Sequence, residues 1–161
     1  MSRHENGYIY QYADIREFII EKTLYENQFN QTVVYYARDK KVGRTVVLKE
    51  IGVRTHKEKR VVENEIKNMI LAEEKTEYTP TIYDYYWYSE RGIYIVIMQY
   101  ISGKSLRNIL EEQKERGTKN IRYNLELWKG ICSVMAAVHE VRGFYHKDLK
   151  PENIVIRRKN T

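Results

Sequence analysis

The chain has 161 residues, with 28 Lys and Arg against 22 Asp and Glu, so its formal net charge is +6. A hydrophobic fraction of 42% is enough for a folded core, and only 8 Gly and 2 Pro exclude collagen-like and disordered chains. The longest apolar run, 93–98, is too short to span a bilayer, and the N-terminus has no apolar segment typical of a secretory signal. The single cysteine, Cys132, suits a reducing compartment. We therefore expect a cytoplasmic protein without a membrane partner.

Basic residues are spread along the chain instead of forming one patch. The densest group, 54–60, includes Glu58 and is soon followed by Glu63 and Glu65. Mixed charge of this kind is typical of a solvated helix face. No groove-reading motif is present, so we predict no nucleic-acid partner.

The first hundred residues predict strands around one helix. Three strands are expected over 18–29, 31–39 and 45–51, with asparagines in the first turn and Gly43 in the second. Apolar residues at helical spacing predict a helix over 57–75. Two further strands are expected over 82–89 and 93–100. The order is that of a five-stranded sheet with one inserted helix.

The remaining residues predict mainly helices. Ser105 is the expected N-cap of a short helix, and an apolar stripe predicts a longer helix over 124–141. A loop over 146–153 and a short β-rich run over 154–156 follow. The chain therefore reads as an α+β lobe and the start of a helical lobe.

Two charged residues occur where apolar neighbours are expected. Lys49 shares a strand face with Val47 and Ile51, because side chains alternate along a strand. Helical spacing places Glu65 on the apolar stripe and Glu63 on the solvated side. A buried, unpaired charge costs several kcal/mol, so we predict that Lys49 and Glu65 form an ion pair. The alternative is that both side chains extend to the rim of the core.

A third feature is the string His-Lys-Asp-Leu-Lys-Pro-Glu-Asn over 146–153. It offers a carboxylate (Asp148), an ammonium (Lys150) and a carboxamide (Asn153) in a loop that Pro151 stiffens. Phosphoryl transfer needs these groups: a base near the accepting hydroxyl, a cation for the developing charge and an oxygen ligand for Mg²⁺. A charged surface turn would explain Asp148 and Lys150 alone, but not the whole string.

This string resembles the catalytic loop H-R-D-L-K-P-E-N of eukaryotic-type serine/threonine protein kinases, and residues 46–49 resemble their V-A-I-K strand. The loop differs from the H-G-D-x-x-x-x-N string of the aminoglycoside phosphotransferases. The resemblance covers 16–161 in order and implies an α+β, protein-kinase-like fold. Its expected parts are an N-terminal extension (1–15), an N-lobe with a five-stranded antiparallel sheet and one helix (16–101), and a partial C-lobe (102–161).

The resemblance implies ATP and Mg²⁺ as cofactors and a Ser/Thr-containing protein as substrate. Asp148 would orient or deprotonate the substrate hydroxyl, and Lys150 would steady the γ-phosphate. Asn153 would ligate magnesium. Lys49 would hold the α- and β-phosphates and pair with Glu65.

The same resemblance implies an adenine pocket at the link between the lobes. Met98 would close the back of this pocket, and the backbone of Gln99 and Ile101 would hydrogen-bond the adenine. Val47 and Val155 would lie above and below the ring.

The sequence departs from the family pattern at three places. The segment that matches the family's G-x-G-x-x-G turn, 24–32, has no glycine, so we expect weaker or altered nucleotide binding, although Asn27 and Asn30 tolerate left-handed conformations. Lys147 replaces an arginine and lacks its bidentate fork. No D-F-G string occurs before Thr161, so the family's main magnesium-binding aspartate and its activation loop are missing.

Three functions stay open on this basis. The chain is a shortened part of a serine/threonine kinase, a kinase-like module that binds a nucleotide or a partner protein without catalysis, or one half of a split kinase. The intact catalytic loop favours the first function and the glycine-free turn favours the second. For the isolated chain we expect negligible phosphate transfer and self-association through the apolar stripe of its C-lobe helix.

Overall fold

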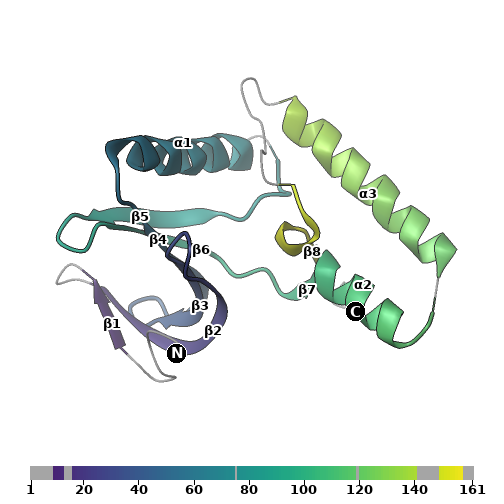
Figure 1. Cartoon of the computed structure of the whole chain (residues 1–161), viewed down its shortest axis with the longest axis horizontal. Coiled ribbons are helices and arrows are strands. Elements are labelled where there is room, and N and C mark those ends of the chain that lie inside the picture. Colours follow the sequence, from purple (N-terminus) through teal and green to yellow (C-terminus); the bar gives the residue numbers. More distant parts are fainter. Residues whose placement is uncertain (1–8, 13–15, 75, 119, 141–148, 158–161) are drawn as a thin grey trace. The chain divides into compact units, whose positions relative to one another are not determined.

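A computed structural model of the chain describes residues 9–12, 16–74, 76–118, 120–140 and 149–157 (Figure 1). The chain divides into two compact units. The first unit comprises Met1–Ile70 and Pro80–Tyr100, and the second comprises Leu71–Thr79 and Ile101–Thr161. No helix in the described part of the chain is both long and apolar enough to cross a membrane.

The first unit contains a six-stranded antiparallel sheet with the strand order β1-β2-β3-β4-β6-β5. All five strands predicted from the sequence form. A sixth strand, β1, comes from the expected N-terminal extension and pairs with β2 at the sheet edge. The strands are β1 (Ile9–Tyr12), β2 (Arg16–Asn27), β3 (Thr32–Asp39), β4 (Thr45–Gly52), β5 (Ile82–Tyr88) and β6 (Ile93–Gln99).

Strands β4 and β6 contribute apolar side chains to both faces of this sheet. On one face, alternate residues of β2, β3, β4 and β6 form the main core. On the other face, Tyr94 and Val96 pack against Val62 and Ile66 of a helix. Burial on both sides explains why the run 93–98 is continuously apolar. The main core consists of Phe18, Ile20, Val33, Tyr35, Ala37, Val46, Leu48, Ile93, Ile95 and Ile97.

The helix that covers the second face is α1 (His56–Glu73). It follows Thr55, whose Oγ1 accepts a hydrogen bond from the Glu58 N–H at 3.2 Å. In return, Oε2 of Glu58 accepts one from the Arg54 N–H at 2.7 Å. This reciprocal arrangement resembles a capping box and explains where the helix begins.

The second unit contains a two-stranded sheet and two helices. Its elements are β7 (Gly103–Ser105), α2 (Leu106–Glu115), α3 (Ile121–His139), a 3₁₀ turn (Pro151–Asn153) and β8 (Val155–Arg157). Ser105 is the N-cap of α2, as predicted, because its side chain accepts a hydrogen bond from the Asn108 N–H at 3.1 Å. Two hydrogen bonds between the amide groups of Gln113 and Asn124 join α2 to α3.

Candidate functional site

Lys49 lies on the face of β4 that α1 covers, and its side chain is half-buried. Ile51, two residues further along the strand, packs in the cluster beneath α1, which confirms the predicted face. Across the β4–β6 ladder, Lys49 is opposite Val96, and Val47 is opposite Met98. The sheet therefore brings together three of the predicted nucleotide-binding residues: Lys49, Val47 and Met98.

The prediction that Glu65 lies on the buried stripe of α1 is wrong. Glu65 is exposed, and within the described residues no ion pair joins it to Lys49. Val61, one helical turn before Glu65, is 50% exposed as well. Glu63, predicted to be solvated, is half-buried instead. The helix is rotated about its own axis relative to the predicted orientation, because side chains on the sheet determine which side of the helix is buried.

Four side chains at the contact between α1 and the sheet, which we call the Tyr94 cluster, explain this roll. The Tyr94 hydroxyl donates a hydrogen bond to Oε1 of Glu63 at 2.6 Å. The Tyr94 ring lies 4.9 Å from the Trp87 ring, and the Lys59 ammonium lies 4.6 Å from the Trp87 ring centre. Burial, followed by the hydrogen bond and charge of Glu63, raises the pKa of Tyr94 above its ordinary value. At neutral pH the hydroxyl is protonated with or without this shift, so it acts as the donor.

The strand end that precedes the link between the units is fixed by Gln99. Its backbone N–H donates to the carbonyl of Thr81 at 2.8 Å, and its side-chain Oε1 accepts from the Thr81 N–H at 3.4 Å. Ile101, the next predicted adenine contact, is half-buried. Its backbone N–H donates to no acceptor in the part of the chain that the structure describes.

The glycine-free turn between β2 and β3 is closed by its own asparagines. Oδ1 of Asn27 accepts from the N–H groups of Phe29 at 2.9 Å and Asn30 at 3.4 Å. Oδ1 of Asn30 accepts from the Thr32 N–H at 3.2 Å. The left-handed residue of the turn is Gln31, with φ of 50°, and neither asparagine adopts that conformation. The N–H groups of Phe29, Asn30 and Thr32 thus already have acceptors within the turn.

In the second unit, the described part of the catalytic-loop string begins at residue 149. Lys150 and Asn153 are exposed, and Val155 is 40% exposed in β8. The Asn153 N–H donates to the Lys150 carbonyl at 2.9 Å, which closes the 3₁₀ turn between them. Asp148, the predicted catalytic carboxylate, lies outside the described residues.

Helix α2 holds this turn through a side-chain and a backbone contact. Nε and Nη2 of Arg107 donate to Oε1 of Glu152 at 2.9 and 2.7 Å. This hydrogen bond, more than any other contact, holds the pKa of Glu152 below and that of Arg107 above the ordinary values. The Leu106 N–H donates to the Ile154 carbonyl at 2.8 Å. The beginning of α2 therefore positions the residues that follow Asp148.

Comparison with known proteins identifies the family to which these strands, helices and loops correspond. Residues 30–161 match the family model described as "Protein kinase domain". The match includes the Lys49 strand, the helix with Glu65 and the whole string 146–153. The chain belongs to the protein kinase family.

Relatives of this kinase domain come from bacteria and a plant. It is 29% identical over 127 residues to the probable serine/threonine-protein kinase pknA2 of Bifidobacterium longum, covering 76% of this chain and 16% of the relative. It is 28% identical over 145 residues to the CBL-interacting protein kinase 33 of Oryza sativa subsp. japonica, covering 88% of this chain and 30% of the relative. The matched region is thus less than a third of either relative.

Sequence reasoning missed a buried carboxylate in the kinase domain. Glu50 is fully buried on the main-core side of β4, opposite Val33 of β3 and Ile95 of β6. Its position two residues after Leu48 in an alternating strand was the available signal.

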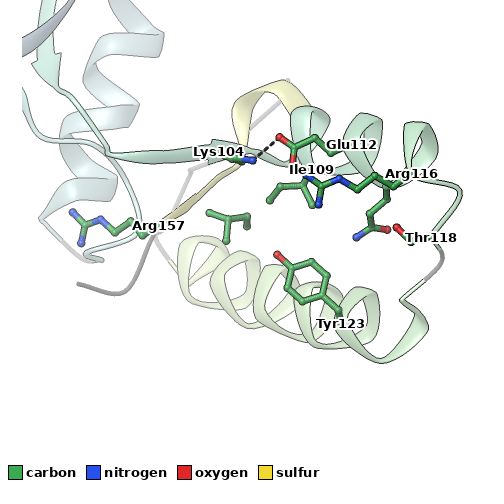
Figure 2. A pocket seen from close by; sticks show the side chains of 9 residues that line it. Lys104, Ile109, Glu112, Arg116, Thr118, Tyr123 and Arg157 are labelled. Atoms are coloured by element: carbon green, nitrogen blue, oxygen red, sulfur yellow. Dashed lines mark hydrogen bonds and ion pairs between the residues drawn. The ribbon is translucent and has the colours of Figure 1, made fainter. Parts of the chain in front are cut away.

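The kinase domain also has a cavity of about 350 Å³ between α2, α3 and β8. Figure 2 shows Tyr123 reaching into it from α3, Glu112 from α2 and Arg116 from the residue that follows α2. An ion pair between Lys104 and Glu112 lies at its edge. None of the residues predicted to bind ATP or Mg²⁺ lines this cavity. The lining residues are Lys104, Ile109, Glu112, Gln113, Arg116, Thr118, Tyr123, Ile156 and Arg157.

The donor chemistry of the described kinase residues fits magnesium through Asn153. The described residues include no group of three or more His, Cys, Asp or Glu side chains that could hold a metal ion by themselves. Magnesium does not need such a group, because it keeps several waters and is held by one or two carboxylates together with substrate phosphates. The exposed carboxamide of Asn153 offers one neutral oxygen to such an ion.

Proposed function

We propose that this chain supplies the ATP-binding strand and the catalytic loop of a protein serine/threonine kinase. The proposed reaction transfers the γ-phosphate of ATP to a Ser or Thr hydroxyl of a protein. The observation that carries this proposal is the continuous family match over 30–161, which includes Lys49 and the string 146–153. The relatives, which are named as serine/threonine-protein kinases or as a protein kinase, support the substrate class.

In this proposal the nucleotide is bound mainly through β4, β6 and the residues that follow β6 in the chain. Lys49 binds the α- and β-phosphates, with Val47 beside it on the same face of β4. Met98, opposite Val47, limits the depth of the adenine pocket. Backbone groups of Gln99 and Ile101 hydrogen-bond the adenine, and the Ile101 N–H is free to do so in the described part of the chain.

The second unit supplies the groups that act on the phosphate being transferred. Asp148 accepts the proton of the substrate hydroxyl, Lys150 steadies the γ-phosphate and Asn153 ligates magnesium. Val155, in the strand that follows, contacts the adenine ring. When bound, Mg²⁺ neutralises charge on the phosphate oxygens.

Substitution of Lys49 tests the nucleotide-binding role. Lys49→Met keeps the length of the side chain but removes its charge, and a hydrogen bond to a charged group contributes about 1.5–3 kcal/mol. We therefore expect the affinity for a fluorescent ATP analogue in the presence of Mg²⁺ to fall by at least about tenfold. The matched control is Lys41→Met, in the exposed turn before β4, which should leave the affinity unchanged. Equal affinity of both variants would remove Lys49 from the site.

A second candidate function is a kinase-like binding module without phosphoryl transfer. The observation that favours it is the β2–β3 turn, where Asn27 already accepts from the N–H groups of Phe29 and Asn30. ATP phosphates that bind the N–H groups of this turn would have to replace Asn27 Oδ1 as their acceptor. If the wild-type chain does not bind the ATP analogue at all, this candidate, with a protein as its ligand, replaces the first.

The long helix of the second unit supports self-association. Ile121, Leu125 and Trp128 of α3 are 70%, 55% and 62% exposed, and they follow one another at helical spacing. Cys132, one turn further along, is exposed as well and suits the reducing cytoplasm that we propose as the location. Trp128→Glu should convert associated species to monomers in sedimentation velocity. An unchanged distribution of species would rule out this surface.

A further inference from the structure

Helix α1 carries two carboxylates on opposite sides of the row that it buries. This row contains Val62 and Ile66. At ~100° per residue, Glu63 lies on one side of the row and Glu65 on the other. Glu63 is half-buried, whereas Glu65 is exposed. The roll of α1 about its own axis therefore decides which carboxylate faces the sheet.

The hydrogen bond and the cation–ring contact that fasten one side of α1 to the sheet both belong to the Tyr94 cluster. Glu63 accepts a hydrogen bond from the Tyr94 hydroxyl at 2.6 Å. The ammonium of Lys59, one helical turn before Glu63, lies 4.6 Å from the centre of the Trp87 ring. Glu65 makes no side-chain hydrogen bond or ion pair within the described residues. The contacts thus favour the roll in which Glu65 points to solvent.

Breaking the Tyr94 contact is costly because little of this residue reaches solvent. Tyr94 is only 3% exposed, and its acceptor Glu63 is half-buried, so water has limited access to the hydroxyl. A buried hydroxyl left without its partner loses the full hydrogen bond. A phenylalanine at the same position has no such requirement and would pack in the same space.

The Tyr94 cluster and Lys49 lie on the same face of the sheet. Tyr94 is opposite Ile51 in the β4–β6 ladder, and Lys49 is opposite Val96, two residues further along β6. A roll of α1 that turns Glu65 toward this face moves Glu63 away from Tyr94. The two contacts, Glu63 with Tyr94 and Glu65 with Lys49, are therefore alternatives.

We propose that Tyr94 is a positioning residue for the nucleotide site. By holding Glu63, it keeps α1 rolled so that Glu65 remains in solvent, and loss of this hydrogen bond allows Glu65 to reach Lys49. The importance of the Lys49–Glu65 pair for catalysis rests on the proposed function. Which of the two carboxylates faces the sheet does not depend on that function, because it follows from the contacts of α1 alone.

Zero-length carbodiimide cross-linking of the full chain tests this choice. The reagent joins an amine to a carboxylate in direct contact with loss of water, and mass spectrometry of the digest identifies the Lys49–Glu65 amide. We expect little of this product in the wild type and at least about tenfold more in Tyr94→Phe. Tyr88→Phe is the matched control, because the Tyr88 hydroxyl lies at the exposed end of β5 and contacts Glu90. This control should give the wild-type yield.

A second variant removes Glu63, the other partner of the hydrogen bond, so that the test does not depend on Tyr94→Phe alone. Glu63→Ala leaves Tyr94 in place and should raise the same cross-link, whereas Asn64→Ala, on the exposed side of α1, should not. Circular dichroism confirms that each variant is folded. The proposal is wrong if the folded Tyr94→Phe and Glu63→Ala variants give the wild-type yield, or if the wild type already gives the high yield.

Binding of the fluorescent ATP analogue distinguishes a failure of the Tyr94 proposal from a failure of the proposed function. If the cross-link rises in both variants but neither the variants nor the wild type bind ATP, Tyr94 still positions α1 and the proposed function fails. If ATP binds in a Lys49-dependent manner while the cross-link never rises, the proposed function stands and the role of Tyr94 is refuted.

Discussion

Replacement of Leu48 by alanine is expected to lower the free energy of unfolding of the first unit by about 2–5 kcal/mol. Leu48 is fully buried in β4, where it lies opposite Tyr35 of β3 and Ile97 of β6. Truncation removes buried apolar surface and leaves a cavity, because a sheet paired on both sides of β4 cannot close around it. Urea unfolding followed by circular dichroism measures the change.

The matched control for Leu48→Ala is Val42→Ala. Val42 lies in the turn before β4 and is 54% exposed, so its truncation should change the free energy of unfolding by no more than about 0.5 kcal/mol. A similar loss of stability in both variants would contradict the assignment of Leu48 to the main core.

Replacement of Gly103 by alanine is expected to disturb the strand that follows the catalytic loop. A Cβ atom at this position would lie 2.3 Å from the Ile156 carbonyl oxygen and 3.0 Å from Cγ1 of Val155. Backbone atoms cannot rotate away as a flexible side chain does, so β7 and β8 must separate. We expect the second unit to lose about 1–3 kcal/mol of stability. Because β8 follows the turn that carries Asn153, we also expect the magnesium-dependent part of ATP binding to weaken.

Hydrogen exchange at 155–157 and titration with the ATP analogue measure the two effects of Gly103→Ala. The control is Gly130→Ala in the middle of α3, where a Cβ would meet no atom within 4 Å. Alanine is the better helix former, so this control should be neutral or more stable by up to about 1 kcal/mol. Faster exchange in β8 with the control, or unchanged exchange with Gly103→Ala, would show that the close approach is not the cause.

The strands were predictable because their signals are local. Alternation along β4 placed Lys49 and Leu48 on opposite faces, and register with β6 confirms both faces. The helix over 56–73 and the Ser105 cap likewise follow from residues a few positions apart. The short strand β1 was missed, because its pairing with β2 depends on a partner that a four-residue pattern does not specify.

The roll of α1 and the state of the β2–β3 turn were not predictable from their own residues. The apolar spacing of α1 predicted Glu65 near the sheet, but Tyr94, 31 residues away from Glu63 in the chain, holds Glu63 there instead. In the turn, asparagines suggested left-handed residues. Their side chains instead accept hydrogen bonds from backbone N–H groups of the turn, and Gln31 is the residue with a positive φ.

By itself, the sequence determined the order of the elements, the residues on each strand face and the membership of the protein kinase family. Only the tertiary structure decided which carboxylate of α1 meets the sheet, that Arg107 holds Glu152 within the string 146–153, and that Glu50 is buried in the main core. The physical reason is the range of the interactions. Periodicity and capping act within one element, whereas a charged side chain at the edge of an apolar stripe is buried or exposed according to the partner that a distant segment provides.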